Sequence, residues 1–160
     1  MIHFSLGRDK YDNQPAQCAA ANFDDFAEQI SRTGSTRKGQ IYVCAALSYG
    51  LHSDPVKYPG SANWRIHQLA EPRGFLALDG DYFANAAVFT DFQQKVAQWS
   101  CVVYTTASHT PTAPRVRAII ELDRSVERAE GIALGEAVER MLGPFCDCQY
   151  SRNPRRMTSL

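Results

Sequence analysis

No apolar run in the sequence approaches the roughly 18 residues that a membrane-spanning helix needs, so we expect no membrane span. The opening segment, MIHFSLGRDKYD, lacks the basic start and apolar core of a signal peptide, which predicts a cytoplasmic location. Net charge is also absent, since 17 basic residues balance 17 acidic ones. This balance argues against a protein that coats nucleic acid through bulk charge, but it leaves room for a local basic cleft. Repeats and low-complexity tracts are missing too, and a hydrophobic content of 44% excludes a disordered chain.

A complete set of zinc ligands is missing as well. The chain has five cysteines, an odd number, and no export signal, which favours reduced thiols in a cytosolic protein. Cys146 and Cys148 form a C-x-C pair, but no C-x-x-C or H-x-x-x-H follows that would complete four ligands. We therefore expect no zinc site, and we expect Cys44 and Cys101 to be small buried hydrophobic residues on strands.

The length of 160 residues suits one domain or a two-lobed unit. Residues 1–70 are predicted to form an N-terminal α/β extension or small lobe. Its helix begins after Asn22, a plausible N-cap that two aspartates follow, and ends before Gly34. The expected segments are a strand at 1–6, a loop at 7–21, a strand at 41–47, and a loop at 48–73 with at most a short helix near 64–70.

Residues 71–160 follow the order β-α-β-β-α-β, which is the plan of a ferredoxin-like or RRM-like palm. The apolar run GFLAL predicts the first strand, and Asn85 is placed to cap the helix after it. Ser125 is expected to cap the second helix, which Gly143 and Pro144 end. We therefore predict an α+β fold in which this palm carries the N-terminal extension. The expected elements are strands at 74–78, 101–105, 115–122 and 145–149, and helices at 85–99 and 125–142.

Asp79 and Asp81 lie at the end of the first strand of this palm. Residues two apart in a strand share a side, so both carboxylates are expected to face one way. Hard oxygen ligands suit Mg²⁺ or Mn²⁺, and such a pair can hold two metals beside a phosphoryl transfer. D-G is also a common turn dipeptide, so a solvated turn is the alternative interpretation.

Histidine and arginine side chains follow in an order that fits the same cleft. Ser108 and His109 come directly after the strand CVVYT, where His109 could donate to a phosphate oxygen or protonate a leaving pyrophosphate. Arg115 and Arg117 share one face of the next strand and could bind a triphosphate or a nucleic-acid backbone. The alternatives are a surface histidine in a polar loop and an exposed strand face paired with acids.

Asp147 precedes a basic C-terminal segment, in which the last ten residues carry three arginines and no acid. Positive charge beside the acidic pair is what a nucleotide-binding cleft needs, whereas a solvated basic tail is the alternative. Glu121 and Asp123 could provide further metal ligands, although salt bridging or helix capping explains them equally well.

Three segments, FLALDGD, YTTASHTPTAPRVRAIIELDRSV and FCDCQYSRNPRRM, together resemble the catalytic core of the archaeo-eukaryotic primase superfamily. The resemblance covers residues 70–157, and the branch it resembles is that of the primase-polymerases of phages, plasmids and integrated elements. SHTPTAPRVR is its most specific part. The resemblance implies a nucleotidyltransferase that joins nucleoside triphosphates on a DNA template and releases pyrophosphate.

The resemblance also implies roles for single residues. The catalytic set would be Asp79, Asp81, His109 and Asp147, in which the three aspartates bind two Mg²⁺ or Mn²⁺ ions and Asp123 or Glu121 is the fallback for the third acid. The set that contacts nucleotide phosphates or template would be Ser108, His109, Arg115, Arg117 and Arg155. The implied partners are single-stranded DNA, an NTP or dNTP, and a helicase or helical accessory domain.

The sequence departs from the family pattern at two points. Gly80 stands where the middle residue of D-x-D is usually hydrophobic, and Arg156 leads into MTSL instead of an Arg-Leu-Pro-Gly-like run. Family members also tend to be longer, so we expect this core to act with a partner or a further domain. Two other functions fit the residues: a non-catalytic replication module that holds single strands on its sheet, and another D-x-D metal-dependent transferase.

Overall fold

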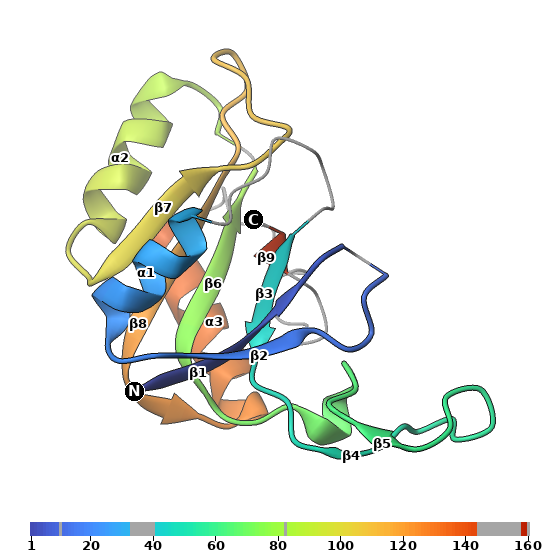
Figure 1. The fold of residues 1–160 in the computed structure, drawn as a ribbon. Coiled ribbons are helices and arrows are strands. Elements are labelled where there is room, and N and C mark those ends of the chain that lie inside the picture. The colour runs from blue at the N-terminus through green and yellow to red at the C-terminus, as the bar shows by residue number, and fades with distance from the viewer. Residues whose placement is uncertain (10, 33–40, 82, 144–157, 160) are drawn as a thin grey trace. The chain divides into compact units, whose positions relative to one another are not determined.

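The computed structural model describes residues 1–9, 11–32, 41–81, 83–143 and 158–159, whose elements appear in Figure 1. Contacts within the chain divide it into two compact units. The N-terminal unit contains Met1–Arg73 and Pro154–Leu160, and the C-terminal unit contains Gly74–Asn153. The predicted mixture of α-helices and β-strands is confirmed, and the sheets are antiparallel. None of the described helices is long and apolar enough to cross a membrane.

Four strands form the main sheet of the N-terminal unit, in the order β2-β1-β3-β9. Their bounds are β1 (Ile2–Gly7), β2 (Ala16–Ala20), β3 (Tyr42–Ala45) and β9 (Thr158–Ser159). β1 pairs antiparallel with both β2 and β3, so it lies inside the sheet. The predicted strands at 1–6 and 41–47 are therefore confirmed. Every residue of β3 is buried, as its apolar run predicted.

β2 shows that the prediction of a loop at residues 7–21 was wrong. Its sequence, AQCAA, has no β-branched or aromatic residue, so local propensity gives no strand signal. The strand is fixed by its neighbour, because β1 supplies a partner to each residue of β2. The Gln17 side chain adds to this pairing, since its Oε1 accepts bonds from Ser5 Oγ at 3.0 Å and from the Leu47 N–H at 2.9 Å.

α1 (Phe23–Arg32) begins where the sequence predicts it. The side chain of Asn22 accepts a hydrogen bond from the backbone N–H of Asp25 at 2.9 Å, as an N-cap does. The helix turns a buried face towards the sheet, where Phe26 meets Phe4 of β1 edge to face with ring centroids 4.9 Å apart. This aromatic contact joins the helix to the sheet in the core of the unit.

The predicted long loop at residues 48–73 contains three short elements. They are β4 (Gly50–Leu51), its antiparallel partner β5 (Ser61–Ala62) and the 3₁₀ helix η1 (His67–Leu69), which is the short helix expected near 64–70. The rings of His52, Tyr58 and Trp64 meet beside them, with centroids 4.3 to 5.5 Å apart. This aromatic group gives the segment an apolar centre of its own.

The C-terminal unit follows the order β6-α2-β7-β8-α3, and its three strands lie in the order β6-β8-β7. The bounds are β6 (Arg73–Gly80), α2 (Ala86–Val96), β7 (Cys101–Thr105), β8 (Val116–Val126) and α3 (Arg128–Leu142). These five elements occur in the order that the sequence predicts. The sixth, a strand at 145–149, lies outside the described residues, so the complete RRM-like arrangement stays a prediction.

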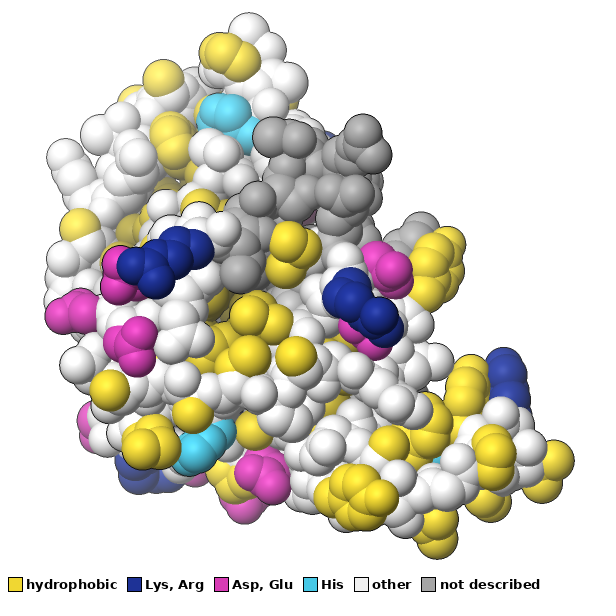
Figure 2. Space-filling view, in the orientation of Figure 1, with side chains coloured by type: hydrophobic (Ala, Val, Ile, Leu, Met, Phe, Trp, Pro, Cys, Tyr) yellow, Lys and Arg dark blue, Asp and Glu magenta, His cyan; other side chains and the backbone are white. Residues whose placement is uncertain are grey.

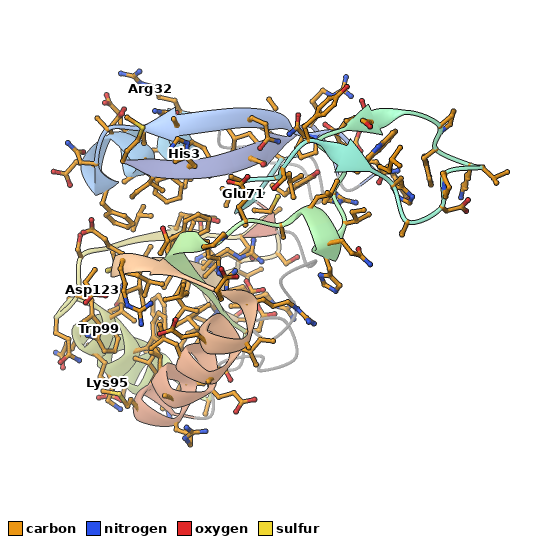
Figure 3. All side chains as sticks on the ribbon, turned by 90° about the horizontal axis from the view of Figure 1, so that it is seen from below. His3, Arg32, Glu71, Lys95, Trp99 and Asp123 are labelled. Atoms are coloured by element: carbon orange, nitrogen blue, oxygen red, sulfur yellow. The ribbon has the colours of Figure 1, made fainter. Side chains whose placement is uncertain are left out.

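One face of the C-terminal sheet packs against α2 and α3, and Figure 3 shows α3 lying along it. The buried cluster on this face consists of Leu76, Leu78, Phe92, Val96, Val116, Ala118, Ile120 and Leu142. Successive residues of a strand point to opposite faces, so Asp79 and Arg117 belong to the other face. Tyr104 joins them there, because it lies directly opposite Arg117 in the pairing of β7 with β8.

α2 begins as predicted and ends earlier. Asn85 caps it, since its side chain accepts a hydrogen bond from the backbone N–H of Val88 at 3.1 Å. The helix ends at Val96 rather than near Trp99. Trp99 still packs against the buried cluster, because the turn after the helix returns the chain to the sheet.

Ser125 does not cap α3, which corrects the predicted helix start. β8 continues through Ser125 to Val126, and Glu127 takes the N-cap position without a side-chain bond. The buried side chain of Val126 explains this outcome, because an apolar residue gains more from continuing the strand than from a solvated cap. The helix ends before Gly143, as the sequence predicted. The φ of this residue is 114°, a value that glycine adopts more readily than other residues.

Cys44 on β3 is expected to resist alkylation in the folded protein. Cys44 is 8% exposed, so the prediction of a buried hydrophobic residue is confirmed. Burial raises the pKa of its thiol to about 12. Because the thiolate is the nucleophile, iodoacetamide at pH 8 should label Cys44 at least about a hundredfold faster in urea-unfolded protein than in folded protein. Peptide mass mapping over time measures both rates. Equal rates would contradict the burial, and the less buried Cys18 serves as the comparison.

Candidate functional site

Asp79 of β6 and Arg117 of β8 form an ion pair across two neighbouring strands. Arg117 Nε donates to Asp79 Oδ1 at 2.6 Å, and Arg117 Nη2 approaches the same oxygen. The side chains are 8% exposed for Arg117 and 13% exposed for Asp79. Shielding from water makes such a charge-assisted bond strong and makes either charge costly without the other. A predicted metal ligand and a predicted phosphate ligand are thus bound to each other.

Tyr104 completes a cluster with this pair. Its hydroxyl is shielded from solvent and has no hydrogen-bond partner in the described part of the chain. Burial raises the pKa of Tyr104 to about 12, against the opposing effect of the Arg117 guanidinium, and the Asp79 charge raises it further. The hydroxyl therefore keeps its proton at neutral pH. We call these three residues the Asp79–Tyr104–Arg117 cluster.

His109 is held by the turn that joins β7 to β8. Its backbone N–H donates to the Thr106 carbonyl at 2.9 Å, and its Nδ1 accepts the backbone N–H of Arg115 at 3.2 Å. Because Nδ1 is the acceptor, the neutral ring carries its proton on Nε2 and can donate it to a ligand. The turn fixes the ring, so His109 is not a loosely placed histidine of a polar loop.

The Asp79–Tyr104–Arg117 cluster and His109 lie at the same end of the C-terminal sheet. Thr105, the last residue of β7, pairs with Val116, the first residue of β8, and His109 is bonded just before that point. Arg115 and Arg117 are two residues apart, so their Cα atoms lie about 7 Å apart along the strand. Side chains from β6, β7, β8 and the connecting turn are therefore gathered where β6 and β7 end and β8 begins.

The other predicted site residues are placed less fully. Asp81 follows β6 directly and is half-buried, and Ser108 is half-buried in the turn. Asp147 and Arg155 lie outside the described residues. The structure therefore brings Asp79 and Arg117 into contact and leaves the third acid as a prediction.

Glu121 and Asp123 do not suit the fallback role of third acid. Both are exposed residues of β8. A strand rises about 3.3 Å per residue, so Glu121 lies about 13 Å along β8 from Arg117, and Asp123 about 20 Å. A metal held by Asp79 is out of reach of carboxylates at such distances.

Part of the positive charge on the described surface is paired with acids. Figure 2 shows basic side chains beside acidic ones at several places on the face displayed. The exposed or partly exposed pairs are Arg8 with Asp12, Arg32 with Glu28, Lys95 with Asp91, and Arg124 with Glu130. Pairs of this kind neutralise part of the surface, so the described residues would attract a polyanion through basic groups outside these pairs, such as Arg115.

The donor chemistry at the sheet end suits a hard divalent cation. Carboxylate oxygens are the ligands that Mg²⁺ and Mn²⁺ prefer, and the Arg117 guanidinium on Asp79 Oδ1 shows that this carboxylate already holds a positive group. The described residues contain no group of three or more acidic, histidine or cysteine side chains arranged to hold a metal. A full coordination sphere would therefore need a ligand outside them, and Asp147 is the predicted one.

Tyr104 is the residue that sequence reasoning missed. The sequence predicts it only as part of the strand at 101–105, and nothing nearby in the sequence marks its hydroxyl as part of a site. Its position beside Arg117 depends on the register between β7 and β8, which the turn from Thr106 to Arg115 sets. That register was the signal that could have identified it, because a tyrosine opposite an arginine in a sheet shares its face.

Comparison with known proteins gives the family. No curated protein and no solved structure matches the chain. No archaeo-eukaryotic primase family model matches either. Residues 62–157, which are more than half of the chain, match the model of the VapE N-terminal domain, a domain of phage and plasmid VapE-like replication proteins. The chain therefore belongs to the VapE N-terminal domain family, which associates it with the replication of mobile genetic elements.

Proposed function

We propose that this chain is a primase-polymerase domain that joins nucleotides on a single-stranded DNA template during replication of a phage, plasmid or other mobile element. The observation that carries the proposal is the bond between Asp79 and Arg117, since it joins a candidate metal ligand to a candidate phosphate ligand on one sheet face. Membership of a replication-protein family supports the setting. The strand order β6-β8-β7, the order expected for the corresponding strands of an RRM-like palm, supports the fold.

In this proposal each residue has a role that its surroundings allow. Asp79, Asp81 and Asp147 would hold two divalent cations, which would supply positive charge for the phosphates and for activation of the primer 3′-hydroxyl. His109 donates from Nε2 to a phosphate oxygen, because its Nδ1 is already bonded to the Arg115 N–H. Arg115 and Arg117 contribute positive charge to the triphosphate or to the template backbone.

A primed-template assay tests the proposal. Wild-type protein should extend a DNA primer on a single-stranded template with Mn²⁺ or Mg²⁺, and Asp81→Asn should reduce extension by at least about a hundredfold. Asp81 is the better target than Asp79, because changing Asp79 also breaks the buried ion pair with Arg117. Asp81→Asn should unfold at the wild-type temperature.

The matched control is Asp91→Asn, which removes a carboxylate from the surface of α2 and should leave extension unchanged. Extension that survives in Asp81→Asn would refute the proposal. Metal-independent binding of single strands without incorporation would favour a replication-associated binding module instead. Activity that requires a nucleotide sugar would favour a D-x-D transferase.

A further inference from the structure

The buried hydroxyl of Tyr104 lacks an explanation within the described structure. Its oxygen is shielded from solvent and has no hydrogen-bond partner among the described residues. Buried polar groups are nearly always bonded, because leaving one without a partner loses the free energy that water supplied. A ligand that supplies a partner would remove this loss, so an orphan hydroxyl beside candidate site residues points to a ligand.

The chemistry of the cluster indicates which ligand atom is missing. The hydroxyl of Tyr104 carries one proton that it can donate in a hydrogen bond. Arg117 lies opposite it and offers only donors. Both side chains can donate into the same space, and a phosphate oxygen placed there, with its negative charge, would accept from each of them.

The charge of the cluster decides when such a ligand can bind. Arg117 donates through Nε to Asp79 and also approaches it with Nη2, so the two charges cancel. While they are paired, they exert little attraction on a phosphate. A carboxylate that binds a divalent cation no longer needs the guanidinium as counter-ion. Arg117 is then able to turn to a phosphate, and the Tyr104 hydroxyl lies beside it.

We propose that Tyr104 and Arg117 form a phosphate-binding pair that is inactive while Asp79 holds Arg117 and becomes active when a divalent cation occupies Asp79. This inference rests on the proposed function, because it takes Asp79 as a cation ligand. It adds a phosphate-positioning role for Tyr104 and a reason why Arg117 is bonded to an acid. By linkage, cation and polyphosphate each raise the affinity of the protein for the other, and Arg117 transmits the effect.

Binding measurements with Mn²⁺ and inorganic tripolyphosphate test the linkage without catalysis. Wild-type protein should bind tripolyphosphate weakly in EDTA, and Mn²⁺ should strengthen this binding by roughly 5- to 150-fold, the usual range of coupling. Arg117→Met should bind Mn²⁺ alone more tightly than wild type, because no guanidinium competes for Asp79, and it should lose most of the coupling. Wild type and variant are compared at the same free Mn²⁺ concentration, so that complexes between Mn²⁺ and tripolyphosphate in solution contribute equally to both measurements.

Tyr104→Phe separates the role of the hydroxyl from that of the charge. It should leave binding of Mn²⁺ alone unchanged and weaken tripolyphosphate binding in the presence of Mn²⁺ by about tenfold. In the ligand-free protein it should raise the melting temperature by about 4 °C, because it removes a buried hydroxyl without a partner. Tyr49→Phe is the matched control, since Tyr49 is 72% exposed, and it should change none of these quantities.

Each outcome decides one hypothesis. If Tyr104→Phe neither raises the melting temperature nor weakens tripolyphosphate binding, the role of Tyr104 is refuted. If Arg117→Met binds Mn²⁺ no better than wild type and keeps the coupling, the exchange of Arg117 is refuted. A chain that fails to extend primers yet shows the linkage refutes the proposed polymerase and retains the phosphate site. A chain that extends primers but lacks the linkage refutes the phosphate site and retains the proposed polymerase.

Discussion

Arg117→Met is expected to destabilise the C-terminal unit by about 3–5 kcal/mol, because it leaves Asp79 as a buried charge without its partner. The side chain of Asp79 is 13% exposed, so water can compensate only a small part of the loss. Urea unfolding followed by Trp99 fluorescence measures the change. Trp99 packs against the core of this unit, and the other tryptophan, Trp64, belongs to the N-terminal unit and is replaced by phenylalanine in all variants compared.

A double variant tests whether the lost free energy belongs to the pair. Asp79→Leu combined with Arg117→Met removes both charges and should recover most of the stability, because apolar residues of similar volume often replace a buried ion pair without loss. Arg124→Met is the matched control, since Arg124 pairs with Glu130 at the surface. Exposed pairs contribute at most about 1 kcal/mol, so a similar loss in Arg117→Met and Arg124→Met would contradict burial of the first pair.

The sequence could predict those elements of the fold that depend on residues close together in the chain. Asn22 and Asn85 cap helices as predicted, because an N-cap depends on residues within one turn. The apolar runs of β1, β3, β6 and β7 likewise mark strands without reference to distant neighbours. β2 could not be predicted in this way, because only its pairing with β1 makes AQCAA a strand. The start of α3 depends on the burial of Val126, which is a tertiary effect.

The candidate site shows the same division. The order of the motifs along the chain predicted one shared cleft for Asp79 and Arg117, and the structure brings these two together. That they bind each other could not be predicted, because it depends on β6 and β8 being neighbours in a particular register. The sequence hypothesis placed Arg117 on a phosphate. The ion pair with Asp79 changes that hypothesis into one in which Arg117 must first leave a carboxylate.

The same ion pair changes how the acidic residues should be tested. A double replacement of Asp79 and Asp81 by alanine would be expected from sequence to spare the fold. Since Asp79 is the partner of a buried guanidinium, its removal is expected to lower stability as well as activity. Loss of activity is therefore informative only for Asp81→Asn, whose carboxylate takes part in no ion pair among the described residues.

Gly7→Ala is expected to destabilise the N-terminal unit by about 3 kcal/mol or more. A Cβ atom at Gly7 would overlap the ring of Tyr42, its partner across β1 and β3. The ring has no room to move, because Tyr42 is fully buried and its hydroxyl donates to the Asp12 carbonyl at 2.6 Å. Arg65 covers the ring from 4.8 Å. Overpacking against such a fixed neighbour strains the backbone of both strands.

Gly50→Ala is the control that distinguishes overlap with a fixed ring from overlap in general. A Cβ there would lie 2.7 Å from Leu69 Cδ2, the end of a flexible side chain that can change its rotamer, so the expected loss is under about 1 kcal/mol. Urea unfolding followed by Trp64 fluorescence, with Trp99 replaced by phenylalanine, measures both variants. Tyr42→Leu should make Gly7→Ala nearly neutral, because it removes the ring that the new methyl group meets. If Gly7→Ala were as mild as Gly50→Ala, β1 and β3 would have to be farther apart at this pair than their register requires.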